Sequence, residues 1–248
     1  MMEMKNKNQL EENFLPGYDP DQQLIAISKV IRQLTLCLKI KEKSFENTDY
    51  TKINHEYAGD LYANDSCELG FLDVAVSHSA IAIYAPFLEG LFKHEIASLK
   101  KNGRPQTPSH IRTGKSRFWE IEWFYNSKGT AVTRGKAKGV AQILDALNIF
   151  NHFPENTEEM LEIIFLYRNY TLHNGFEAET EEKTKINSKI QSNNWSNYFI
   201  WATTDGELWM LSMKKEFITK CFDFCRSIKE GFDKEKRGYI RISQRPKP

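Results

Sequence analysis

The segment from Phe71 to Lys101 constrains the fold more than any other part of the sequence. It reads FLDVAVSHSAIAIYAPFLEGLFKHEIASLKK, and its apolar residues cover most of the circumference of a helix. A helix that is apolar nearly all round is normally buried among other elements. We therefore expect a long central helix, kinked at Pro86 and ending in lysines that suit the helix dipole. We interpret His78, on the same segment, as a core histidine.

Other helices are expected around this segment. Asp19-Pro20-Asp21 has the composition of a helix start, with an Asp cap, a proline at the first helical position and an acid in the first turn. Apolar residues then recur at helical spacings of three and four: Leu24, Ile27, Ile31, Leu34 and Leu38. Further helices are predicted over residues 136–150, 157–173 and 213–233, whereas residues 45–70 are polar and give no clear prediction.

Two aromatic-rich segments predict β-structure. Residues 116–125 (SRFWEIEWFY) are typical of a strand, and residues 197–211 (NYFIWATTDGELWML) of a hairpin around an Asp-Gly turn. Residues 102–113 and the charged stretch 177–194 are expected to be loops. The fold class is therefore mainly α, a helical bundle with a small antiparallel β-sheet or hairpin. We expect one domain over residues 1–248, with a flexible tail at 1–18, a basic loop and strand insertion at 102–135 and a hairpin at 195–211.

The charge of the chain is unevenly distributed, although its net charge is only +1. Residues 100–138 hold ten Lys and Arg against two Glu, and residues 226–248 hold eight basic against three acidic residues. Such a chain can present a basic face to a polyanion. The N-terminus has no apolar signal segment, and the apolar stretch from Ala80 to Phe92 is too short to span a bilayer. We expect a cytoplasmic protein with no membrane partner.

Several kinds of catalytic centre lack support in the sequence. The stretch SHIRTGKS (109–116) ends like a phosphate-binding loop, but it has Ser in place of the first Gly and follows a proline-bearing loop. The six histidines form no HExxH set, no GxSxG motif is present, and the four cysteines form no CxxC pair. We interpret Cys221 and Cys225 as buried free thiols. No metal ion or other cofactor is expected.

The helix expected over residues 157–173 ends in the unusual stretch YRNYTLHNG. At an advance of about 100° per residue, Glu162, Asn169 and His173 share a narrow polar stripe, and Arg168 lies at the edge between apolar arcs. Burying these groups without partners would cost a few kcal/mol each. One interpretation is structural: Arg168 and Glu162 each form salt bridges, while Asn169 and His173 bond to backbone groups. The broad packing face comprises Met160, Ile163, Ile164, Tyr167, Tyr170 and Thr171, and a second apolar strip comprises Leu161, Phe165 and Leu172.

The other interpretation is functional. Arg168-Asn169-Tyr170-Thr171-Leu172-His173 resembles the R-x4-6-H motif of the HEPN superfamily (higher eukaryotes and prokaryotes nucleotide-binding), in which a polar residue, often Asn, follows the Arg. The family's motif lies late in an all-α bundle. The match covers fewer than ten residues, within a helical context of about residues 71–176 plus the last helix. Gly175 stands where one toxin subgroup of the family has a Tyr, so regulation by modification of that Tyr is not implied.

The resemblance implies a metal-independent endoribonuclease. In this reading His173 moves the proton of the ribose 2′-hydroxyl, which suits an imidazole with an ordinary pKa of about 6.5. Arg168 would hold the scissile phosphate, and Asn169 would orient the imidazole or a phosphate oxygen. The expected products are a 2′,3′-cyclic phosphate and a 5′-hydroxyl end. By analogy, the biological role would be that of a toxin or antiviral defence effector.

The spacing of the motif adds an expectation about assembly. Arg168 and His173 are roughly 140° apart on one helix, which is awkward for a single phosphate. Two copies about a two-fold axis could bring Arg168 of each chain to His173 of the other. Because members of the family also build composite sites in dimers, we expect a homodimer with a composite active site.

The basic segment supplies candidate contacts to RNA. Phosphates could bind Arg112, Lys115, Arg117, Lys136 and Lys138, and Trp119 is among the aromatic residues that could stack on unpaired bases. The alternative is a solvated loop whose aromatic residues pack on the core. Two other functions remain open: a non-catalytic HEPN-like module that binds RNA or a protein, and an unrelated helical interaction protein. The sequence also leaves open a regulatory protein partner.

Overall fold

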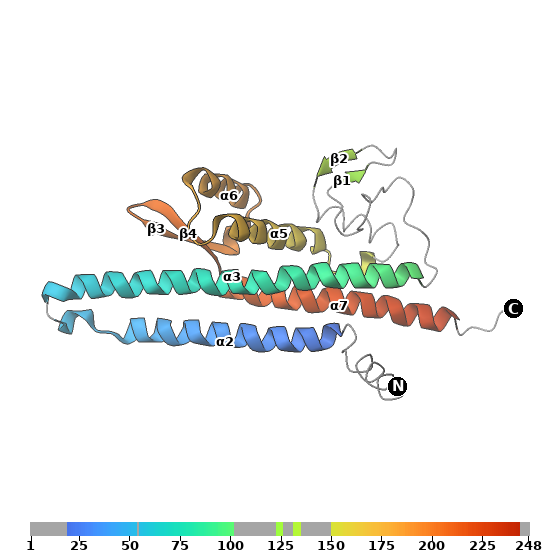
Figure 1. Ribbon diagram of the computed structural model, residues 1–248, viewed down its shortest axis with the longest axis horizontal. Helices are drawn as coiled ribbons and strands as arrows, with labels where there is room; N and C mark the ends of the chain where they lie inside the picture. The colour runs from blue at the N-terminus through green and yellow to red at the C-terminus, as the bar shows by residue number, and fades with distance from the viewer. Residues whose placement is uncertain (1–18, 54, 102–122, 126–130, 135–149, 244–248) are drawn as a thin grey trace, which may run out of the picture.

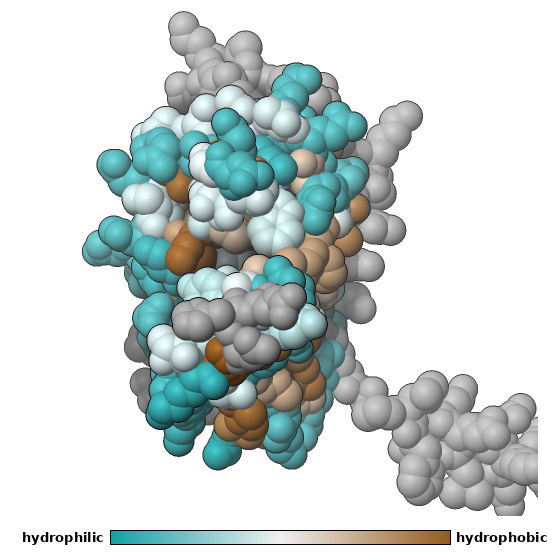
Figure 2. All heavy atoms as spheres, turned by 90° about the vertical axis from the view of Figure 1, so that its left-hand side faces the viewer, coloured by the Kyte–Doolittle hydropathy of each residue, from teal (hydrophilic) through white to brown (hydrophobic). Residues whose placement is uncertain are grey.

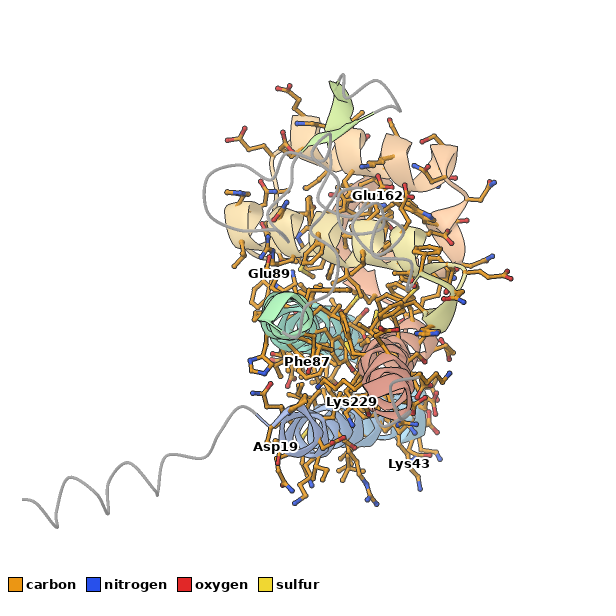
Figure 3. All side chains as sticks on the ribbon, turned by 90° about the vertical axis from the view of Figure 1, so that its right-hand side faces the viewer. Asp19, Lys43, Phe87, Glu89, Glu162 and Lys229 are labelled. Carbon is orange, nitrogen blue, oxygen red and sulfur yellow. The ribbon has the colours of Figure 1, made fainter. Side chains whose placement is uncertain are left out.

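A computed structural model describes residues 19–53, 55–101, 123–125, 131–134 and 150–243. Three long helices form its base: α2 (Pro20–Asn47), α3 (His55–Lys101) and α7 (Lys215–Ser243). Above them lie α5 (Thr157–Asn174) and then α6 (Thr180–Ser192) (Figure 1). Seen from the end, the order of layers is α2, then α3 with α7, then α5, then α6 (Figure 3). The prediction of a mainly α fold with a small antiparallel sheet is confirmed in the described residues.

The predicted central helix is present and longer than expected. α3 begins at His55, sixteen residues before Phe71, and Pro86 lies within it without ending it. Its partners are α2, α5, α7 and β4 (Glu207–Met213). The polar N-terminal half is anchored to the end of α2, because Lys41 pairs with Asp65 at 3.4 Å and with Glu68 at 2.7 Å. The sequence did not predict this half of the helix, because ion pairs between residues distant in the sequence produce no apolar periodicity.

The two helices that begin and end the described chain largely follow their sequence patterns. Asp19 caps α2 as predicted, with its carboxylate accepting from the backbone N–H groups of Asp21 and Gln22 at 3.0 Å. The last helix runs to Ser243, ten residues beyond the predicted end. Cys221 and Cys225 are both free and buried on α7, which confirms their interpretation.

The charged stretch 177–194 is a helix, so the loop prediction there was wrong. α6 buries only Ile186 and Ile190, four residues apart on one face. Glu181 and Glu182 stand in its first turn, where carboxylates suit the helix dipole. Two apolar residues are too weak a pattern to distinguish such a helix from a loop.

The predicted hairpin is present as β3 (Phe199–Thr204) and β4, paired antiparallel. Asp205 and Gly206 both have positive φ, of 50° and 82°, as a two-residue hairpin turn requires. A second pair joins β1 (Trp123–Tyr125) to β2 (Ala131–Arg134). β1 confirms the end of the strand predicted over 116–125; the rest of that strand, the tail at 1–18 and most of the helix predicted over 136–150 lie outside the described residues.

Interior hydroxyl groups tie the layers together. Ser77 on α3 is fully buried; its Oγ donates to the carbonyl oxygen of Asp73 at 2.8 Å and accepts from the N–H of Met213 at 2.9 Å. Tyr84 donates to the carbonyl oxygen of Ile218 at 3.0 Å. Tyr167 of α5 donates to that of Leu211 at 2.9 Å. Because each buried hydroxyl bonds to a backbone group of another element, these bonds fix the register of α3 and α5 against β4 and α7.

Length and composition would allow the segment Tyr57–Phe92 of α3 to cross a membrane. Half of its most apolar window is buried inside the fold, and the core helix of a soluble protein has the same properties. Apolar side chains also reach the surface at the end where α2 passes into α3 (Figure 2), and those exposed on these two helices there include Ile40, Tyr57, Leu61 and Tyr62. The absence of a membrane partner and the cytoplasmic location therefore stay predictions.

Two glycines should respond oppositely to alanine. A Cβ on Gly231 of α7 would lie 2.8 Å from the Phe153 ring and 2.9 Å from the carbonyl oxygen of His152, whereas a Cβ on Gly90 of α3 would meet nothing within 4 Å. Helix propensity alone favours alanine by up to about 1 kcal/mol. Urea unfolding should show that Gly90→Ala is neutral or stabilising and that Gly231→Ala is destabilising by about 1–3 kcal/mol. Equal effects would contradict the close approach at Gly231.

His78 should make stability depend on pH. It is half-buried, with its ring 6.0 Å from that of Tyr167 and 5.0 Å from that of Phe176, and burial lowers its pKa to about 4. Between pH 4 and the ordinary histidine pKa near 6.5, the unfolded chain binds a proton at His78 more readily than the folded chain does. The contribution of neutral His78 to the free energy of unfolding is therefore full above pH 6.5 and is lost as pH falls toward 4. His78→Leu should therefore lose less stability than the wild type between pH 7 and pH 5 in urea titrations. An unchanged difference between the two proteins would contradict this.

Candidate functional site

The last two turns of α5 carry the candidate residues. α5 buries Met160, Ile163, Ile164, Tyr167, Tyr170 and Thr171, so the predicted packing face is confirmed. Leu172 is an exception to its predicted apolar strip, because it is 70% exposed while Leu161 and Phe165 are buried. α5 ends at Gly175, which has a positive φ of 62° and donates its N–H to the carbonyl oxygen of Thr171 at 3.0 Å. This ending leaves His173 exposed on the final turn.

Arg168 faces α3. Its Nη1 donates to Oε1 of Glu89 at 2.8 Å, and the two side chains are 16% and 17% exposed. Figure 3 shows Glu89 where α3 meets α5. The guanidinium carbon also lies 5.4 Å from the centre of the Phe165 ring. Both residues form salt bridges, as the structural interpretation expects: Glu162 pairs with Lys189 of α6 at 3.0 Å, and Arg168 pairs with Glu89.

Asn169 bonds to Arg168 and lines the groove beside His173. Its Oδ1 accepts from Nε of Arg168 at 3.2 Å and from Nη2 at 3.1 Å. Three of the five guanidinium N–H groups are therefore used, and within the described residues the Asn169 amide nitrogen makes no hydrogen bond. Asn169 also lines the same groove as His173, and Arg168 does not. Within one chain, the structure brings Asn169 to both residues but does not bring Arg168 and His173 together.

The groove beside His173 lies between α5 and α6 and has a volume of about 550 Å³. Leu166, Tyr170 and Ile186 provide its apolar surface. Its polar lining consists of Asn169, His173, Asn174, Glu182, Lys185 and Lys189. Because residues 177–194 were predicted to be a loop, the groove residues on α6 were not among the candidates. The spacing of Lys185 and Lys189, four residues apart as on one helix face, is the signal that could have identified them.

The cations of the groove are already in ion pairs with carboxylates. Lys185 pairs with Glu182 at 3.0 Å and Lys189 with Glu162 at 3.0 Å (Glu162 is labelled between α5 and α6 in Figure 3). Pairs with this exposure contribute about 0–1 kcal/mol each, so a phosphate can compete for either lysine. The charge of these four groups sums to zero. Affinity for a polyanion would therefore depend on other basic residues as well.

Tyr170 is the groove residue with an unmet hydrogen-bonding need. Its side chain is 93% buried, and its hydroxyl has no hydrogen-bond partner within the described part of the chain. Burial, with a smaller contribution from the charge of Glu182, raises the pKa of Tyr170 to about 12. The group is thus a neutral O–H donor at physiological pH. A buried donor without an acceptor costs about 1–3 kcal/mol, which a bound oxygen atom would recover.

The predicted RNA-binding residues Arg112, Lys115, Arg117, Trp119, Lys136 and Lys138 lie outside the described residues. Among the residues that the structure describes, no group of three or more His, Cys, Asp or Glu side chains could hold a metal ion. Comparisons with family models, with curated proteins and with solved structures found no match to this chain.

The Arg168–Glu89 pair should be strongly coupled in stability. Arg168→Ala removes the charge that faces a mostly buried carboxylate and should lower the free energy of unfolding by about 1–3 kcal/mol. In a double-mutant cycle with Glu89→Ala, measured by urea unfolding, the coupling energy should be about 1 kcal/mol or more. Losses that simply add would mean that the contact contributes little, leaving Arg168 energetically free for a ligand.

Proposed function

We propose that this protein is a metal-independent endoribonuclease that cuts RNA in the groove between α5 and α6. The observation that carries the proposal is that one groove is lined by the exposed His173 and by Tyr170, whose buried hydroxyl has no partner among the residues that the structure describes. The first group can move a proton near neutral pH, and the second can donate a hydrogen bond to an anionic oxygen. The resemblance of Arg168-Asn169-Tyr170-Thr171-Leu172-His173 to the HEPN motif supports the same reaction.

The chemistry assigned to the groove is transesterification within RNA. His173 takes the proton of a ribose 2′-hydroxyl, and the resulting oxygen attacks the adjacent phosphorus atom. The bond from phosphorus to the 5′-oxygen breaks, and that oxygen takes a proton from solvent. The products are a 2′,3′-cyclic phosphate and a 5′-hydroxyl end. The Tyr170 hydroxyl and the amide N–H groups of Asn169 donate to the phosphate oxygens as negative charge grows on them.

In this proposal Arg168 does not hold the scissile phosphate of its own chain, which is the role that the motif implies. Its guanidinium is held by Glu89 and Asn169 on the side of α5 away from the groove, so in its own chain it positions Asn169. Two of its five N–H groups make no bond within the described residues and could reach a phosphate bound by a second copy. We propose a homodimer on this basis.

Leu172 supports the dimer. At 70% it has the highest exposure among the large apolar side chains of the described chain, and it stands four residues after Arg168 and next to His173. Phe176, 43% exposed, follows the end of the same helix. An exposed apolar pair beside a catalytic histidine is well placed to be covered by the partner copy.

A second candidate function is a HEPN-like module that binds RNA or a protein without cutting. The Arg168–Glu89 ion pair favours it, because a guanidinium held by a carboxylate gives less stabilisation to a phosphate. Such a module would retain RNA in a salt-dependent manner with no turnover. A role as a toxin or antiviral effector belongs to the catalytic proposal and would need the activity first.

Incubation of the wild-type protein with total RNA in EDTA tests the activity. We expect fragments with 2′,3′-cyclic phosphate ends, and a loss of at least about 100-fold in cleavage rate for His173→Ala, because general acid–base catalysis contributes about that much or more. The matched control is His94→Ala, since His94 is exposed on α3 and does not line the groove. Equal cleavage by wild type and His173→Ala would contradict the proposal.

Tyr170→Phe is the second variant in the same assay. Removing a hydroxyl that has no partner should leave thermal stability unchanged or raise it, while cleavage falls. A variant that loses both stability and cleavage would show that the hydroxyl has a structural partner and would remove this support for a bound phosphate.

A further inference from the structure

A second groove runs between α2 and α7, on the opposite side of the base layer from α5 and α6 (Figures 1 and 3). It consists of two hollows of about 350 Å³ and about 460 Å³ that share Ser28 and Phe222 in their lining. Because the two hollows share residues from both helices, they form one continuous groove. None of the residues that line it belongs to the site proposed for RNA.

One edge of α2 forms the first wall of the groove. Its members recur at alternating intervals of four and three residues, as one face of a helix does: Ile25, Lys29, Arg32, Leu36 and Lys39. At 1.5 Å per residue this edge is about 21 Å long, or about four turns of helix. Thr219, Phe222, Arg226, Lys229 and Glu230 of α7 form the opposite wall. A straight groove between two helices has the shape that accepts a third helix.

The groove has an apolar component that water covers in the free protein. Ile25 is 47% exposed and Leu36 is 48% exposed, near opposite ends of the α2 edge. Phe222, partly buried against the core, lies between them on the α7 side. Large apolar side chains at a groove with polar surroundings are typical of a protein interaction site.

The groove also carries an excess of positive charge. Lys29, Arg32 and Lys39 form no ion pair with any residue that the structure describes. On the other wall, Lys229 is neutralised by Asp21 at 2.6 Å and Asp233 at 2.7 Å (Figure 3 labels Lys229 between α2 and α7). Arg226, on the same wall, pairs with Asp223 at 3.6 Å, so the groove cations without an ion pair among the described residues are Lys29, Arg32 and Lys39, against the carboxylate of Glu230. A ligand with negative charge along its length would balance the surplus.

We propose that this groove binds an acidic amphipathic helix of a partner protein, laid along α2 and α7. The apolar face of that helix covers Ile25, Leu36 and Phe222, and its carboxylates meet Lys29, Arg32 and Lys39. This binding is independent of ribonuclease activity, because no residue lines both grooves.

Two other occupants fit less well. A second copy of the chain that used the same edge of α2 would bring Lys29, Arg32 and Lys39 of both copies together, and like charges at an interface are strongly unfavourable. A single RNA strand would need an open aromatic face for stacking. The Phe222 ring already has the guanidinium of Arg226 at 4.9 Å from its centre.

Fluorescence anisotropy with two synthetic helical peptides tests the proposal. Both peptides, about four turns long, carry leucine at heptad spacing; one has glutamate and the other lysine at the remaining positions. The full-length protein should bind the glutamate peptide and not the lysine peptide, with affinity that falls as salt is added. Arg32→Glu with Lys39→Glu should weaken binding by at least about tenfold. Lys43→Glu, on an exposed lysine of α2 outside the groove, should leave it within about twofold.

Three outcomes would overturn the proposal. The first is equal binding of the two peptides, and the second is an equal loss of affinity in Lys43→Glu and in the groove variant. The third is displacement of the glutamate peptide by a single-stranded uridine oligonucleotide, which would identify the groove as an RNA site. Circular dichroism of each variant checks that the helix content is unchanged, so that a loss of binding reports on the groove.

Discussion

The burial of α3 is the constraint on which the rest of the structure depends. One helix contacts α2, α5, α7 and β4, and its buried residues include Tyr84, Leu88 and Phe92. Because it is apolar on several sides, no single neighbour can cover it. α2 and α7 cover one side and α5 with β4 another, while the hydroxyls of Ser77 and Tyr84 fix the positions of β4 and α7 along the helix. The groove between α5 and α6 and the groove between α2 and α7 follow from this arrangement, one on each side.

Local patterns in the sequence predict the parts of this fold that are locally determined. Asp19 predicts the start of α2, and the aromatic runs around Asp205-Gly206 predict the hairpin. Tertiary contacts determine the parts that the sequence did not reveal. α6 buries only two isoleucines and is also held by the pair of Lys189 with Glu162, and the N-terminal half of α3 is held by contacts such as Lys41 with Glu68, 27 residues apart.

The candidate site likewise has features that the sequence predicts and features that it does not. The helical wheel of residues 160–174 correctly separates Tyr167 from His173, and it anticipates that Arg168 and His173 diverge on one helix. It cannot identify Glu89 as the partner of Arg168, because Glu89 stands 79 residues away in the sequence. Nor can it show that Tyr170, correctly predicted on the packing face, lines a groove and ends in a hydroxyl with no partner among the described residues. Periodicity predicts the direction in which a side chain points but not the partner of its terminal polar atom.

The central claim is that RNA binds where His173 and Tyr170 meet, and an NMR titration of the histidine side chains tests it most directly. The ligand is a short RNA whose ribose 2′-hydroxyl groups are replaced by hydrogen, so that it binds without being cut. The account predicts that the imidazole resonances of His173 shift on titration while those of His94, exposed on α3, do not, and that Tyr170→Phe reduces the shift. Saturable binding of the oligonucleotide with no change at His173 would contradict it.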